Sequence, residues 1–248
     1  MEQNDGIAFM KAGDGSYTVG LGPFDEFAVA PENATAFYVN DFALSCQQPW
    51  KVPARIIEVP NLADLGYGKE ELEIRWDELE SESFATVFAE INEMIVKGVI
   101  EKSVPVATER GRLVSGIGDR LIGRMQNLGA PFYSYGWSSG KSGFCGATPE
   151  LLFKQEGRSL KTMALAGTAK ADEQVVFAVD GKEIREHEFV AQTMVAKLSD
   201  IGVVERSERN ILDLGQLVHF HTPIDVELFA HRSVDELIKR LHPTPALG

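Results

Sequence analysis

Residues 146–168 read GATPELLFKQEGRSLKTMALAGT, and this stretch predicts a β-hairpin. Its two apolar runs flank Glu156-Gly157-Arg158, a sequence typical of the turn between antiparallel strands. Strand-like and turn-like segments also fill the chain from Phe132 up to this stretch. Because these strands are joined by short turns, the pattern favours antiparallel pairing over the strand–helix alternation of a parallel sheet.

Helix patterns occur on both sides of the hairpin. Apolar residues recur at helical spacing over residues 83–96. A second helix is expected over residues 181–199, with Asp180 as its N-cap. A third begins at Ser233, where Ser233-x-x-Glu236 matches a capping box. Strands followed by helices in this order predict an α+β fold with largely antiparallel sheets.

The composition excludes several classes of protein. In 248 residues, 37 Asp and Glu outweigh 24 Lys and Arg, so the formal net charge is −13. Such a chain repels phosphate backbones and anionic lipid, which argues against nucleic-acid and membrane partners. It shows no signal-peptide pattern and no apolar run near the ~18 residues of a transmembrane helix. Cys46 and Cys145 match no zinc or disulfide pattern, so we expect a cytoplasmic protein.

The chain divides into two regions by composition. Residues 1–75 are rich in Gly, Pro and Asp, contain short strand-like runs and carry no chemical motif, so we assign them as an N-terminal strand-rich region. Residues 70–82 are strongly acidic and indicate a solvated connector. Residues 76–248 hold every candidate site residue and form the predicted catalytic region.

Lys102 is the first candidate site residue, because the alternation of residues 100–106 predicts a strand with Lys102 on its apolar face. A buried ammonium group pairs with an acid or loses its proton, and a lysine with a lowered pKa can act as a base. The alternative is that the period slips at Pro105 and Lys102 lies in solvent.

Three glutamates are further candidates. Glu150 follows a turn shaped by Gly and Pro at the start of an apolar strand, where it is either a general acid or an ordinary polar residue. Glu183 and Glu186 are three residues apart and share a helix face. Two such carboxylates suit Mg²⁺, which prefers oxygen ligands, but a solvated acidic face is the commoner explanation of this spacing.

Small residues and histidines mark two more positions. Gly167, within Ala166-Gly167-Thr168, would let the backbone approach a ligand closely, or would form a tightly packed turn. His219 and His221 alternate and therefore share one strand face. They either bind a metal ion together or, more simply, one is buried and the other lies at the edge of the buried region.

Taken in order, these motifs resemble those of the chorismate-utilising enzymes, which include isochorismate, salicylate, anthranilate and aminodeoxychorismate synthases. The resemblance covers roughly residues 84–248, about two-thirds of the chain. It implies two antiparallel sheets with outer helices. The family continues beyond the segment matching residues 242–246, so the fold is expected to be incomplete at its C-terminus. A missing C-terminal segment or a partner chain would then complete it. The matching stretches are the strand with Lys102, Gly146–Leu152, Met163–Thr168, Lys182–His187, Val218–Phe220 and Leu241–Gly248.

The resemblance is closest to the isochorismate synthase branch. In that branch lysine occupies the position of Lys102 and activates water, whereas ammonia-using branches typically have glutamine. Aminodeoxychorismate synthases often carry a nucleophilic lysine where this chain has Ala166. The implied reaction therefore converts the small-molecule substrate chorismate to isochorismate with water as the nucleophile, feeding menaquinone or siderophore biosynthesis.

The resemblance also implies a role for each candidate residue. Lys102 would deprotonate a water that attacks C2 of the ring, and Glu150 would protonate the hydroxyl that leaves C4. Glu183 and Glu186 would help to hold Mg²⁺, which offsets the charge of a substrate carboxylate. The residues implied in substrate binding are Ala166, Gly167, Thr168 and His219.

Other functions are compatible with the same motifs. Salicylate synthases begin with the same water attack and then eliminate pyruvate. Ammonia-using anthranilate or aminodeoxychorismate synthases are disfavoured by Lys102 and Ala166. A different class is a non-catalytic fragment or remnant that binds a chorismate-like anion or a partner chain.

Overall fold

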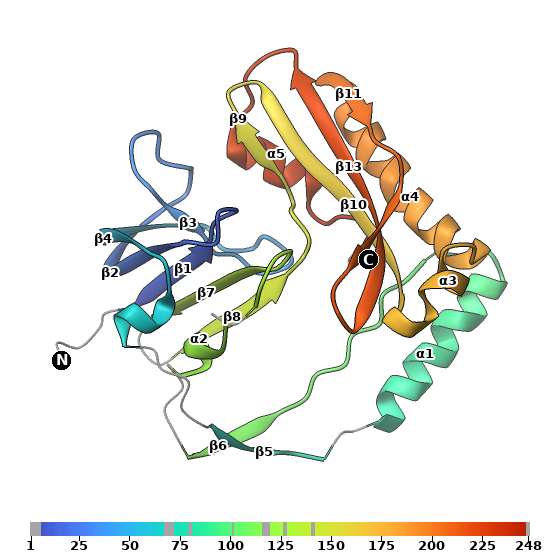
Figure 1. Ribbon diagram of the computed structural model, residues 1–248, viewed down its shortest axis with the longest axis horizontal. Coiled ribbons are helices and arrows are strands. Elements are labelled where there is room, and N and C mark those ends of the chain that lie inside the picture. Colours follow the sequence, from blue (N-terminus) through green and yellow to red (C-terminus); the bar gives the residue numbers. More distant parts are fainter. Residues whose placement is uncertain are drawn as a thin grey trace. The chain divides into compact units, whose positions relative to one another are not determined.

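The computed structural model describes residues 6–66, 72–78, 81–100, 102–115, 120–125, 128–139 and 142–246 (Figure 1). Contacts divide the chain into two compact units. The first comprises residues 1–101 and 105–149, and the second comprises residues 102–104 and 150–248. The boundary at residue 75 came from composition rather than contacts and stays a prediction.

The first unit is built on a six-stranded antiparallel sheet in the order β3-β4-β2-β1-β7-β8. One face packs on a 3-10 helix (Leu62–Leu65) and on α2 (Arg120–Met125), because alternate residues of β1 and β2 are apolar. A separate ribbon pairs β5 (Glu73–Trp76) with β6 (Gly111–Ser115). The strands of the large sheet are β1 (Ile7–Lys11), β2 (Tyr17–Phe27), β3 (Phe37–Tyr38), β4 (Trp50–Val59), β7 (Tyr133–Ser139) and β8 (Ser142–Thr148).

The segment around residue 100 shows one correct and one wrong prediction. Helix α1 spans Ser81–Val96, which confirms the predicted helix with a start two residues earlier. The strand predicted over residues 100–106 is wrong, because residues 102–110 form no strand in the structure. Alternation of apolar residues indicates which side chains share a face, but a strand also needs a neighbouring strand to pair with. Pro105 has no backbone N–H group to donate to such a neighbour.

The second unit contains a five-stranded antiparallel sheet, β11-β13-β10-β9, with β12 also paired to β13. The predicted hairpin is confirmed, since Glu156 of β9 pairs with Ser159 of β10 across Gly157. The strand before that turn is shorter than predicted and begins at Lys154. The elements are β9 (Lys154–Glu156), β10 (Ser159–Lys170), α3 (Gln174–Phe177), α4 (Gly181–Leu198), β11 (Gly202–Arg206), β12 (Asn210–Asp213), β13 (Leu217–Leu228) and α5 (Val234–Leu241).

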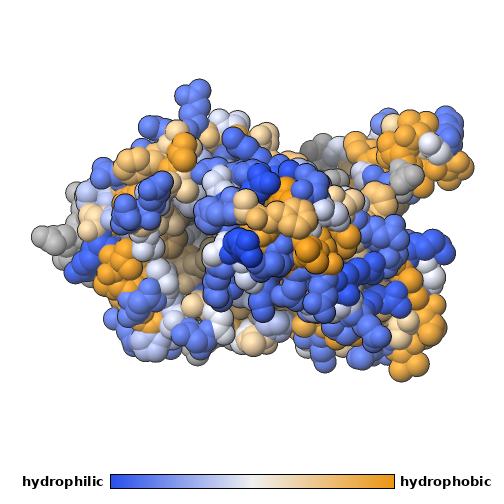
Figure 2. All heavy atoms as spheres, turned by 90° about the horizontal axis from the view of Figure 1, so that it is seen from above, coloured by the Kyte–Doolittle hydropathy of each residue, from blue (hydrophilic) through white to orange (hydrophobic). Residues whose placement is uncertain are grey.

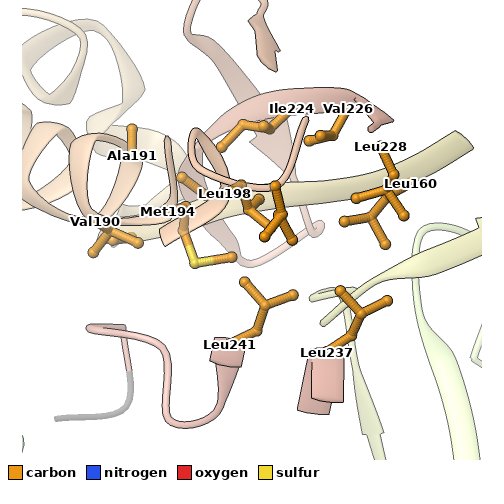
Figure 3. Packing of buried hydrophobic residues seen from close by; sticks show 13 residues of the cluster. Leu160, Val190, Ala191, Met194, Leu198, Ile224, Val226, Leu228, Leu237 and Leu241 are labelled. Atoms are coloured by element: carbon orange, nitrogen blue, oxygen red, sulfur yellow. The ribbon is translucent and has the colours of Figure 1, made fainter. Parts of the chain in front are cut away.

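The core of the second unit lies between one face of its sheet and the helices α4 and α5 (Figure 3). Every even-numbered residue of β13 from Val218 to Leu228 is buried, so one strand face is fully covered. Both predicted caps are present: Asp180 accepts from the backbone of residues 182 and 183, and Ser233 accepts from Glu236. The α4 residues in this core are Val190, Ala191, Met194 and Leu198.

The surface combines hydrophilic and hydrophobic side chains. On the face shown in Figure 2, hydrophilic side chains cover large areas and hydrophobic side chains form patches between them. Among the described residues, no helix is both long enough and apolar enough to span a membrane.

Candidate active site

Lys102, Glu150, Glu183 and Glu186 all belong to the second unit. The Nζ of Lys102 lies 2.6 Å from the carbonyl oxygen of Pro245 and 3.3 Å from Oε1 of Glu186. The side chain of Lys102 is only 19% exposed. The lysine therefore lies largely out of solvent and contacts an acid, although the backbone that carries it is irregular.

Glu150 is largely shielded from water. Burial raises the pKa of its carboxyl group, while a hydrogen bond from Thr244 Oγ1 at 3.4 Å and the charge of Lys102 partly offset that rise. Burial is the largest of these effects because a carboxylate loses its hydration when it leaves water. A raised pKa keeps more of the group protonated near neutral pH, as a general acid requires.

Strand β10 carries a bulge at Ala166-Gly167-Thr168, where its register against β13 shifts. Gly167 has φ 77°, in the left-handed region that favours glycine. A Cβ atom on Gly167 would lie 3.2 Å from the backbone oxygen of Glu183. Glycine is therefore needed both for the backbone conformation and for the approach of α4. The side chain of Ala166 packs in the core, so only its backbone is available to a ligand.

Side chains from α4 and β13 bind the backbone of the bulge. Oε2 of Glu183 accepts a hydrogen bond from the backbone N–H of Thr168 at 3.1 Å. Nδ1 of His219 lies 3.0 Å from the carbonyl oxygen of Gly167 and 2.9 Å from Oγ1 of Thr168. Because a carbonyl oxygen only accepts, Nδ1 of His219 is the donor in its contact with Gly167. Glu183, Gly167, Thr168 and His219 therefore form one connected cluster.

His187 also contacts the bulge, and the sequence reasoning missed it. Its side chain is fully buried, with Nδ1 3.3 Å from the carbonyl oxygen of Ala166 and Nε2 2.8 Å from Oγ1 of Thr222. Burial lowers the pKa of His187 to about 4, so the ring is neutral at pH 7. One feature of the sequence could have identified His187: it follows Glu183 by four residues, which places both side chains on one helix face.

The carboxylates of Glu183 and Glu186 do not form a solvated acidic face. Their side chains are 16% and 32% exposed, and Oε1 of Glu183 also accepts from Lys182 at 2.6 Å. Within the described ranges, no group of three or more His, Cys, Asp or Glu side chains could hold a metal ion. Mg²⁺ commonly takes one or two carboxylates and completes its shell with water and substrate, so magnesium binding by Glu183 and Glu186 stays a prediction.

His219 and His221 are both half-buried, so the expectation of one buried histidine and one at the edge of the buried region is wrong. Nδ1 of His221 lies 3.1 Å from Oδ1 of Asn210, whereas His219 contacts the bulge. Only His219 therefore joins the candidate site.

Known proteins resemble this chain in sequence and in fold. The family model described as chorismate binding enzyme matches residues 56–248. Isochorismate synthase MenF of Bacillus subtilis (strain 168) is 35% identical over 115 residues, covering 42% of this chain and 24% of that protein. Isochorismate synthase EntC of Escherichia coli (strain K12) is 26% identical over 180 residues, covering 66% of this chain and 42% of that protein. The chain thus spans less than half the length of these two relatives.

A solved structure shows the same fold. The menaquinone-specific isochorismate synthase MenF from Escherichia coli matches with a TM-score of 0.73 at 16% identity, covering 99% of this chain and 70% of that chain. This likeness confirms the predicted α+β architecture of antiparallel sheets. With the family model covering most of the chain, the resemblance found in the motifs is also confirmed: the chain belongs to the chorismate binding enzyme family.

Proposed function

We propose that this chain carries the acid, the base and the metal-binding carboxylates for Mg²⁺-dependent conversion of chorismate to isochorismate. The observation that carries the proposal is that Lys102 and Glu150 both bond to one short turn, through Pro245 and Thr244. Burial biases Glu150 toward holding a proton, and Lys102 is the proposed proton acceptor. Addition of water and loss of a hydroxyl require one group of each kind. Because the chain spans only part of its relatives, its activity by itself is part of the proposal.

The reaction balances as an exchange of one water for another. Lys102 takes a proton from a water that attacks C2, the ring double bonds shift, and Glu150 protonates the hydroxyl that leaves C4 as water. The proton gained by Lys102 returns to Glu150 through solvent. In the structure, oxygens of Glu186 and Pro245 lie within hydrogen-bond distance of Nζ of Lys102. As a neutral amine, Lys102 would donate its two N–H groups to these oxygens and keep a lone pair for the proton of the attacking water.

The bulge and α4 supply the remaining parts of the proposed site. Glu183 and Glu186 would hold Mg²⁺, which would offset the charge of a substrate carboxylate when bound. Gly167 and Thr168 would line the substrate with backbone, since no side chain projects from Gly167. Nε2 of His219, the ring nitrogen that does not contact the bulge, would contact a substrate hydroxyl. The product would feed menaquinone or siderophore biosynthesis.

Removing either metal-binding carboxylate should weaken Mg²⁺ binding. Glu183→Gln and Glu186→Gln should each raise the Kd for Mg²⁺ by at least about tenfold, because each loses an anionic oxygen ligand while keeping its shape. Isothermal titration of the chain with Mg²⁺ measures this. Glu205→Gln, on the exposed edge of β11, removes the same charge away from the site and is the matched control. Equal Kd values in all four proteins would refute the assignment.

The direct test of the function is incubation with chorismate and Mg²⁺ followed by chromatographic separation of the products. Isochorismate alone is the expected product. Salicylate with pyruvate would move the chain to the salicylate synthase branch. An amino product formed with added ammonia would overturn the choice of water as the nucleophile.

A further inference from the structure

Residues 242–246, the proline turn, contact both the proposed base and the proposed acid. The carbonyl oxygen of Pro245 accepts from Lys102 at 2.6 Å. Oγ1 of the neighbouring Thr244, which is buried, donates to Oε1 of Glu150 at 3.4 Å. A displacement of the proline turn would therefore disturb a contact of each group.

Lys197 holds the proline turn from the last turn of α4. Its Nζ donates to the carbonyl oxygen of Pro243 at 3.0 Å and reaches that of Leu241 at 3.4 Å. The prolines at 243 and 245 have no backbone N–H groups, so the turn has few donors with which to hold itself. The ammonium group of Lys197 supplies donors from outside the turn.

The surroundings of Lys197 are unusual for a half-buried lysine. Among the described residues, no carboxylate forms an ion pair with it, and burial lowers its pKa. The nearby Asp200 pairs instead with Arg240 at 2.6 Å. An ammonium group in such a place is costly unless its hydrogens are bonded, so Lys197 depends on the carbonyl groups it contacts.

We propose that Lys197 is a positioning residue that acts through the proline turn to set the positions of Lys102 and Glu150. Its effect on turnover rests on the proposed function, whereas its effect on the environment of Glu150 does not. The simpler alternative is that Lys197 only caps the C-terminus of α5, because Leu241 is the last residue of that helix. A cap alone would change stability without changing the chemistry of Glu150.

The first arm of the test is kinetic. Lys197→Met keeps the length of the side chain but removes its donors, and it should lower kcat by roughly 10- to 100-fold with little change in KM, since small misplacements of catalytic groups are costly. Lys197→Arg, which restores donors, should recover kcat to within about threefold. Lys239→Met removes an exposed cation from the last turn of α5 and is the matched control, with kcat unchanged. Thermal unfolding of each variant is measured in parallel.

The second arm does not depend on turnover. The pKa of the Glu150 carboxyl is followed by NMR titration of side-chain carboxyl carbons, assigned with Glu150→Gln. Loss of the Thr244 hydrogen bond and of the nearby Lys102 charge should raise this pKa further in Lys197→Met and leave it unchanged in Lys239→Met.

The two arms separate the possible failures. If the unaltered chain shows no turnover, the proposed function fails, and the NMR arm alone decides the role of Lys197. A Lys197→Met variant with a lower Tm but an unchanged Glu150 pKa and an unchanged kcat would overturn the proposal and leave Lys197 as a helix cap.

Discussion

Lys102→Ala is expected to lower chorismate turnover by roughly 10²- to 10⁴-fold while leaving the fold intact, because a positioned general base contributes an effect of that size. The stability cost should be small, since the partner of Lys102, Glu186, is 32% exposed and can be hydrated when the lysine is gone. Steady-state kinetics with chorismate measures the loss, and circular dichroism confirms the fold.

A matched control and a rescue sharpen this test. Lys161→Ala removes a lysine of the same unit that is 65% exposed and should leave turnover unchanged. A small primary amine added to Lys102→Ala should restore part of the activity, because it can occupy the space of the missing side chain and accept a proton. A Lys102→Ala protein that keeps more than about a tenth of the original turnover would show that another group is the base.

Glu150→Gln is expected to cause a loss of similar size, about a thousandfold, because the amide keeps the shape of the acid but cannot protonate a leaving hydroxyl. The variant should be at least as stable as the original chain at neutral pH. The folded-state pKa of Glu150 is raised by burial, so its stabilising effect is present below the unfolded pKa and is lost as pH rises through the folded pKa. A neutral amide avoids that loss, so inactivity cannot be ascribed to unfolding.

The pH profile gives an independent check on Glu150. A general acid must be protonated, so kcat/KM should fall as pH rises through the pKa of Glu150. Thr244→Val removes the hydrogen bond that lowers this pKa, so the alkaline limb should move to higher pH. An unchanged alkaline limb in Thr244→Val would mean that Glu150 does not control it.

Local patterns were sufficient to predict much of the second unit. The hairpin at Gly157 and the caps at Asp180 and Ser233 depend on residues that are neighbours in sequence, and each is present. The strand order of the first unit was not predictable in this way, because β1 pairs with β7 through residues such as Ile7 and Ser138. The spacing of apolar residues within one segment does not indicate which distant segment it pairs with.

The candidate site shows the same division. Local pattern marked Lys102, Glu150, Glu183 and Gly167 as candidates and the family resemblance gave their roles, but neither gave what they contact. The bond from Lys102 to Pro245 spans 143 residues of sequence, and the bulge at Gly167 depends on a register shift between two long strands. His187 was missed because a histidine on an acidic helix stretch does not reveal that it is fully buried.

The most direct test of the account is turnover of chorismate by this chain with Mg²⁺ in ¹⁸O-labelled water, with the products separated and weighed by mass spectrometry. Attack of water on C2 predicts isochorismate that carries one ¹⁸O atom, since the new hydroxyl comes from solvent and the original C4 hydroxyl is lost. Isochorismate without the label would contradict attack by a solvent water, and with it the assignment of Lys102 as the base.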